Sequence, residues 1–160
     1  MSDAGDEVEP GNQDRPDRIV HDPKAGCAFC AILAGTRTAD VVLDEERAVA
    51  FLDLKPLFKG HVLVVPRAHV ETLPDLPAAD LAPLFSAVQR VCRALEVALG
   101  AHGTFVAINN KVSQSVAHLH THVVPRRRKD GLRGFFWPRE PYVSDAEREE
   151  FVTRLRGALR

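Results

Sequence analysis

The sequence predicts an α+β domain built on an antiparallel sheet. Two observations carry this prediction: several short runs rich in β-branched residues, and one long segment, 77–100, in which apolar residues recur at intervals of three and four. The strand-like runs are grouped around this helix and do not alternate with further helices, as the strands of a parallel sheet would. We therefore expect a five-stranded antiparallel sheet, one long helix and a short C-terminal helix.

The size and charge of the chain limit the classes of protein to consider. Its 160 residues and 17.6 kDa suit one domain. Residues 1–24 are rich in Asp, Glu, Pro and Gly without apolar periodicity, so we predict a disordered lead-in before a single domain over 25–160. The sequence shows no run near the roughly 20 apolar residues of a membrane span and no secretory signal, which favours a cytoplasmic protein. A net charge of −1 does not show the excess of positive charge that is typical of a nucleic-acid-binding protein.

The first half of the chain holds three strand-like segments. Residues 41–43 and 48–52 flank the charged run 44–47, which predicts a hairpin. The run 61–65 is dense in β-branched residues and predicts an interior strand. We expect Pro66 to end this strand, because proline cannot donate to a sheet ladder.

The segment 77–100 is the predicted long helix. Gly100 is a natural residue to follow the last helical turn, since glycine tolerates the left-handed conformation that closes many helices. Pro83 would remove a helical hydrogen bond, at about 3 kcal/mol. We therefore expect the first turn to be irregular or the helix to start late.

The last part of the chain predicts two more strands and a final helix. The strands are expected at 104–109 and 118–125. Ser144 with Glu147 three residues later has the pattern of a helix-capping box, so a short helix is expected to follow Ser144.

Three of the seven histidines occupy alternate positions of the last predicted strand: His118, His120 and His122. Alternate side chains share one face of a strand, with Cα atoms about 6.5–7 Å apart, so three imidazoles line one surface. Neutral imidazole is a nucleophile toward phosphorus, and a neighbouring imidazolium can neutralise charge or deliver a proton. The spacing favours phosphoryl or nucleotidyl transfer with His120 as nucleophile. A zinc ion held by the three ring nitrogens, with water in the fourth position, stays open as the alternative.

A small polar loop precedes these histidines. It offers amide, hydroxyl and backbone N–H donors that could hold a phosphate against them. The loop donors are Asn109, Ser113, Gln114 and Ser115.

The cysteines indicate a second kind of chemistry. Cys27 and Cys30 are separated by two residues, which in a reducing compartment indicates metal or redox chemistry. Two thiolates fill only half of a zinc tetrahedron, so the other ligands must come from elsewhere. We favour a structural zinc, and a redox pair or unliganded thiols stay open. Cys92 lies in the helical segment and is expected to be a buried small hydrophobe.

On these motifs the sequence resembles the histidine triad (HIT) family. The resemblance covers roughly residues 27 to 128 and rests on GHVLVVPR at 60–67, on Asn109 with SQSV at 113–116, and on HLHTHVVP at 118–125. Thr121 and Ala117 depart from the hydrophobic residue and the proline usual at these positions, and neither departure removes a reacting group. The resemblance implies a HIT-like α+β fold.

The resemblance also implies a role for each matching residue. In the family the middle histidine attacks the α-phosphorus of a nucleotide and forms a covalent nucleotidyl-enzyme intermediate, a role that falls on His120. Phosphate binding and leaving-group departure fall on His122, and support of the triad by hydrogen bonding falls on His61. The apolar matches could equally be core residues. The implied substrate-binding residues are Phe29, Phe51, Leu54 and Asp53 for the nucleoside and Asn109, Gln114 and Ser115 for the phosphate.

Zinc-bearing relatives imply the remaining zinc ligands. They complete the tetrahedron with a histidine after the proline-containing strand end and with the first triad histidine, here His69 and His118. Together with Cys27 and Cys30 these residues would hold a structural zinc and leave His120 free to react.

The function implied is that of a HIT-type nucleotide hydrolase or nucleotidyltransferase. Its small-molecule substrate would be a nucleoside phosphoramidate or a dinucleoside polyphosphate of the diadenosine tetraphosphate type, cleaved at the α-phosphate. The family also implies a homodimer formed through the helix at 77–100 and an edge strand. The alternative from another class is a zinc-stabilised nucleotide-binding module with little turnover.

Overall fold

The computed structural model describes residues 23–132 and 140–159. The chain divides into two compact units after Arg128. The lead-in predicted for 1–24 lies almost entirely outside the described residues, and the single domain over 25–160 stays a prediction. Among the described residues no helix has the length and apolar character needed to cross a membrane.

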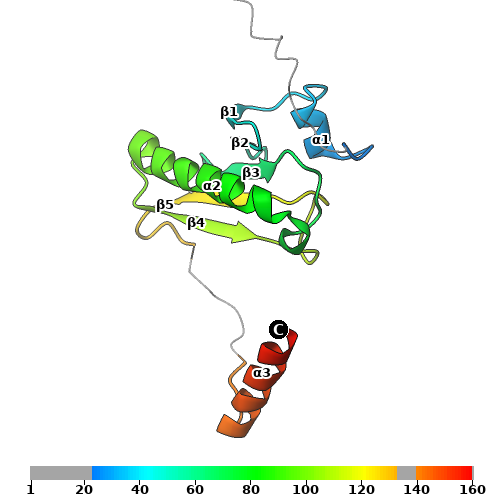
Figure 1. Cartoon of the computed structure of the whole chain (residues 1–160). Coiled ribbons are helices and arrows are strands. Elements are labelled where there is room, and N and C mark those ends of the chain that lie inside the picture. Colours follow the sequence, from blue (N-terminus) through cyan, green and yellow to red (C-terminus); the bar gives the residue numbers. More distant parts are fainter. Residues whose placement is uncertain (1–22, 133–139, 160) are drawn as a thin grey trace, which may run out of the picture. The chain divides into compact units, whose positions relative to one another are not determined.

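The first unit is built on a five-stranded sheet (Figure 1). All neighbouring strands are antiparallel, in the order β1-β2-β3-β5-β4, which confirms the predicted fold class. This order places β5 beside β3, with His122 opposite Leu63. The strands are β1 Val41–Asp44, β2 Ala48–Leu52, β3 Val62–Pro66, β4 Gly103–Ile108 and β5 Thr121–Arg126.

The strands β1, β3 and β4 differ from the sequence prediction by one residue at one or both ends, and β5 begins three residues later than predicted. Pro66 is the last residue of β3, opposite Ala48, so it ends the strand as predicted. Strand β5 begins at Thr121, so His118 and His120 precede it. The backbone N–H of His118 donates to Val116 O (2.8 Å) and so is not available to a sheet ladder.

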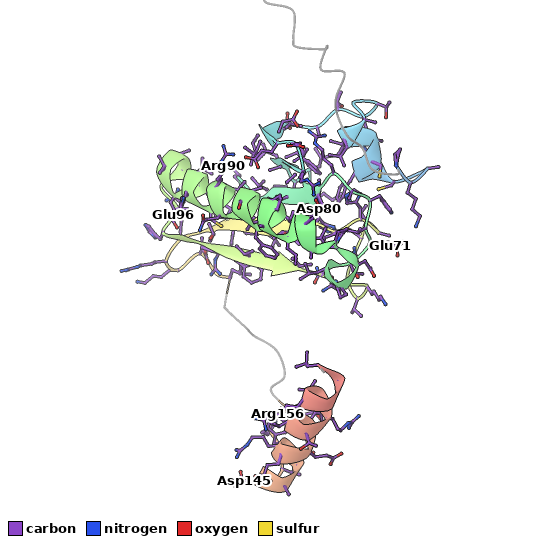
Figure 2. The ribbon with its side chains drawn as sticks, in the orientation of Figure 1. Glu71, Asp80, Arg90, Glu96, Asp145 and Arg156 are labelled. Atoms are coloured by element: carbon purple, nitrogen blue, oxygen red, sulfur yellow. The ribbon has the colours of Figure 1, made fainter. Side chains whose placement is uncertain are left out.

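Helix α2, Ala78–Leu99, covers one face of the sheet (Figure 1). Its apolar stripe packs on β2, β3 and β5, whereas Arg90 and Glu96, labelled in Figure 2, are exposed. Gly100 follows in the left-handed conformation with φ 59°, as predicted. Pro83 lies inside a helix that begins at Ala78, so the expected late start was wrong. The buried residues that follow Pro83 stabilise the helix enough to offset one missing bond.

The other face of the sheet is covered by α1, Ala28–Leu33, a six-residue helix that the sequence analysis did not predict. Phe29 and Leu33 pack there against Phe51 and Leu63. These strand residues alternate with the ones that face α2, because successive side chains of a strand point to opposite faces. A 3₁₀ turn, η1, spans Leu73–Asp75.

The second unit contains α3, Asp145–Ala158. The Ser144 side chain accepts a hydrogen bond from the N–H of Glu147 (3.1 Å), which confirms the predicted cap. None of the helix residues is buried.

Candidate active site and metal centre

Two cysteines and two histidines converge beside α1. Cys27 caps the N-terminus of α1 and Cys30 lies in its first turn, while His69 follows β3 and His118 precedes β5. The Cys30 Sγ atom lies 3.2 Å from His69 Nδ1 and 3.6 Å from His118 Nδ1. Cys27 Sγ lies 3.6 Å from His118 Nδ1, and the two Nδ1 atoms are 3.2 Å apart. The four side chains that sequence reasoning joined as metal ligands are therefore brought together.

This geometry fits a tetrahedral zinc ion. Ligand bonds of about 2.3 Å to sulfur and about 2.0–2.1 Å to nitrogen give tetrahedral edges of about 3.6 Å for S···N and about 3.3 Å for N···N. The Nε2–H of His118 donates to Pro66 O (2.9 Å), which leaves the Nδ1 lone pair directed at the cluster. Burial lowers the pKa of His118 to about 4, so its ring is neutral, the form that binds metals. Burial raises the pKa of the Cys30 thiol, and a bound cation would favour the thiolate instead.

A hydrogen bond fixes which nitrogen of His120 can react. The Nδ1 atom lies 2.7 Å from the carbonyl oxygen of His118, an acceptor, so Nδ1 carries the proton. The neutral ring then has its lone pair on Nε2. The ring edge-packs on Phe29, with centroids 5.3 Å apart, and is 3% exposed. This arrangement holds the His120 ring in one orientation, with Nε2 as the nitrogen not engaged by the His118 carbonyl.

His61 fixes the tautomer of His122 in the same way. The backbone N–H of Leu57 donates to His61 Nδ1 (3.2 Å), so Nε2–H of His61 donates to His122 Nδ1 (3.0 Å). His122 is therefore left with its proton on Nε2. Burial lowers the pKa of both rings, that of His122 to about 4, while the Asp53 carboxylate, 3.4 Å from His61 Nδ1, acts in the opposite direction. His61 is 3% exposed and holds His122 in place through this hydrogen bond.

A pocket of about 370 Å³ opens over His120 and His122. It brings together both histidines and five of the seven residues predicted to bind substrate: Phe29, Phe51, Asp53, Leu54 and Ser115. Sequence reasoning missed the other lining residues, namely Ala28, Ile32, Arg37, Thr38, Ala39, Leu52, Lys55, Leu63 and Val116. Two of them had a signal: Ile32 lies three residues after Phe29 and so on the same helix face, and Val116 belongs to the SQSV motif.

The HIT domain family matches residues 34–129. The chain belongs to this family. An uncharacterized HIT-like protein of Mycobacterium tuberculosis is 37% identical over 83% of this chain and 92% of the relative. An adenosine 5′-monophosphoramidase of Schizosaccharomyces pombe is 31% identical over 72% of this chain and 85% of that enzyme. A zinc-bound histidine triad family protein from Mycobacterium smegmatis has a solved structure with a TM-score of 0.64 and 35% identity, covering 83% of this chain and 97% of the other.

Two residues expected to contact phosphate in this HIT domain do not line the pocket. Asn109 donates to the carbonyl oxygen of Ser113 (3.4 Å). Gln114 accepts from the N–H of Lys111 (2.8 Å) and donates to the carbonyl oxygen of Glu71 (2.6 Å). Both side chains therefore brace the loop that carries Ser115.

Proposed function

We propose that this HIT protein is a nucleotide hydrolase or nucleotidyltransferase that acts on a nucleoside phosphoramidate or a dinucleoside polyphosphate through a covalent nucleotidyl-His120 intermediate. The observation that carries the proposal is the bond from His120 Nδ1 to the His118 carbonyl, because it leaves the Nε2 lone pair available for attack. The pocket supplies an apolar slot with Asp53 for the ribose hydroxyls and Ser115 for the phosphate.

The reaction requires two displacements at the α-phosphorus. In the first, His120 Nε2 forms a bond to phosphorus while the bond to the leaving group breaks with its electrons. An anionic phosphate beside His122 favours the doubly protonated ring. In that state His122 Nδ1–H donates to His61 Nε2, and His61 takes the tautomer with its proton on Nδ1, 3.4 Å from Asp53 Oδ2. The Nε2–H of His122 then goes to the leaving group. In the second, water attacks the same phosphorus, the P–N bond to His120 breaks, and the proton of the water restores His122. The product is a nucleoside monophosphate.

We propose further that Cys27, Cys30, His69 and His118 hold one structural zinc. The tetrahedral spacing of their donor atoms supports this, as does the zinc-bound relative from Mycobacterium smegmatis. The zinc would join α1 to the segment that precedes β5 and so stabilise one wall of the pocket. Thiolate ligands also favour the cytoplasm, where thiols stay reduced.

We propose that the protein forms a homodimer through α2 and the edge strand β4. On the helix, Val88 packs in the core, whereas Phe85 is 41% exposed. Leu81 and Val106, on α2 and β4, are exposed to similar extents, 40% and 41%. Light scattering is expected to give twice the monomer mass, and a monomer mass would remove this proposal.

The experiment that tests the proposed activity is rapid mixing with a fluorogenic nucleoside phosphoramidate. A covalent intermediate predicts a burst of leaving group followed by steady turnover. Denaturation at high pH should trap a nucleotidyl group on the peptide that contains His120, since its P–N bond is acid-labile. A nucleotide-binding module with little turnover would bind nucleoside monophosphate and release no product.

Stereochemistry separates attack by His120 from attack by a zinc-bound hydroxide. Two successive in-line displacements retain configuration at a chiral phosphorothioate, whereas a single displacement by metal-bound water inverts it. We expect retention. Inversion without an adduct on His120 would overturn the mechanism and leave the fold unchanged.

A further inference from the structure

Arg37 lines the same pocket as the reacting histidine and follows the C-terminal end of α1. Phe29, in the first turn of α1, contacts His120, and Ile32 follows one turn later along the same wall. Each residue advances a helix by about 1.5 Å, so the wall leads from His120 toward the C-terminal end of α1. Arg37 follows that end and also lines the pocket.

The backbone at Arg37 is anchored to α1. The carbonyl oxygen of Ala31 accepts from the N–H of Arg37 (3.1 Å) and from both the N–H (2.9 Å) and the hydroxyl (3.1 Å) of Thr36. These bonds fix where the Arg37 side chain begins. In the described part of the chain the Arg37 guanidinium has no ion-pair or hydrogen-bond partner, so its donors are available to a ligand.

The position of Arg37 fits the base of a nucleotide. If phosphorus lies at His120 and the ribose at Asp53, the base extends farthest from His120, along the slot formed by Phe29 and Ile32. A guanidinium carries only donors, in a planar fork. Guanine presents two adjacent acceptors, O6 and N7, whereas adenine presents one acceptor and an amino donor that a guanidinium cannot satisfy.

We propose that Arg37 reads the base and gives this protein a preference for guanosine over adenosine nucleotides. This inference rests on the proposed function for the identity of the ligand as a nucleotide. Lys55 also lines the pocket, but its ammonium is a point charge without a planar fork, so we assign the discrimination to Arg37.

The test compares guanosine and adenosine 5′-phosphoramidates as substrates, and GMP and AMP as ligands in titration calorimetry. The wild-type protein is expected to favour guanosine by about 5-fold or more, the lower end of what a bidentate arginine–guanine pair provides. Arg37→Met is expected to abolish this preference. Arg37→Lys is expected not to restore it, because lysine keeps the charge and loses the fork. Lys59→Met, a cation that lines a different hollow along α2, is the matched control and should keep the wild-type ratio.

Each contrary outcome removes the proposal. Equal losses with both bases in Arg37→Met would mean that Arg37 binds a phosphate or supports the fold. Full rescue by Arg37→Lys would mean that charge alone acts, and loss of the ratio in Lys55→Met with none in Arg37→Met would assign the discrimination to Lys55. The calorimetric ratio needs no turnover, so a protein that binds GMP over AMP without cleaving substrate would refute the proposed activity and leave the role of Arg37 standing.

Discussion

Removing zinc is expected to release α1 while the sheet and α2 stay folded. The helix has six residues, and helices shorter than about 12–15 residues are marginal in water without other support. Its main apolar anchors are Phe29 and Leu33, 7% and 1% exposed. Cys27 and Cys30, at its start, are the proposed thiolate ligands of zinc.

The free energies indicate that burial of Phe29 and Leu33 alone is too weak to keep α1 folded on the sheet. Burying Phe29 and Leu33 contributes about 3–6 kcal/mol, at about 1.5–3 kcal/mol for each side chain. Ordering the backbone of six residues costs about 6–12 kcal/mol, at about 1–2 kcal/mol per residue. Structural zinc contributes about 10–16 kcal/mol in zinc-finger peptides, which covers this deficit. The core beneath α2 shares no side chain with α1 and is expected to persist.

The assay is hydrogen exchange with and without EDTA, with metal analysis of the untagged protein at one zinc per chain as the starting point. The amides of Ala31 and Ala34, which donate to Cys27 O and Cys30 O, are expected to lose protection. Amides in β3 and β5 are expected to keep theirs. KM for substrate is expected to rise, because Phe29 and Ile32 leave the pocket wall.

Matched cysteine variants provide the control. Cys30→Ser is expected to reproduce the effect of EDTA, whereas Cys92→Ser, on α2 and outside the cluster, is expected to keep the metal. Unchanged protection of α1 after verified zinc removal would refute the reasoning. Simultaneous loss of protection in α1 and in the sheet would refute it as well, because it would show that α1 does not unfold separately.

Three further predictions concern single residues. His120→Ala is expected to lose nearly all turnover, and His122→Ala is expected to lose turnover by about 10²–10⁴-fold. The variant His102→Ala, at an exposed histidine, is the control. More than a tenth of wild-type activity in His120→Ala would contradict the assignment of His120 as nucleophile. Burial holds the pKa of His122 at about 4, below the value of about 6.5 in the unfolded chain. Between roughly pH 4 and pH 6.5, the His122 ring therefore binds a proton in the unfolded chain and not in the folded protein. The free energy of unfolding should therefore fall as pH is lowered from about 6.5 to about 4, by less than about 1.4 kcal/mol per pH unit for this partly exposed ring. Urea titrations of His122→Asn should show a smaller change in the free energy of unfolding over this pH range. Identical pH dependence in the variant and the wild type would contradict this prediction. Gly60→Ala is expected to destabilise by about 1–3 kcal/mol, because φ is +95°, a conformation that residues with a Cβ rarely adopt. The exposed end of the Leu99 side chain, 2.5 Å from the new Cβ, can move aside. A urea midpoint near wild type would show that the turn adapts.

The sequence by itself determined the sheet, the long helix and the reacting groups. Alternation in HLHTHVV has the period of an extended chain, so it placed His120 and His122 together without knowledge of the fold. Helix α2 could be predicted from the sequence because its 22 residues repeat the apolar pattern many times. Helix α1 has fewer than two turns, too few for such a pattern, and it was missed together with Arg37 beyond its end.

Only the tertiary structure decided the chemistry of each histidine. The free nitrogen of His120 is set by the carbonyl of His118, and that of His122 by His61, whose own tautomer depends on the N–H of Leu57. The same is true of Gln114, whose amide is bonded to the backbone of Lys111 and of Glu71 and does not line the pocket. An imidazole exchanges its two neutral tautomers freely, so a hydrogen-bond partner selects between them. For His120 that partner is two residues away in the chain, whereas for His122 it is 61 residues away and is brought near only by folding.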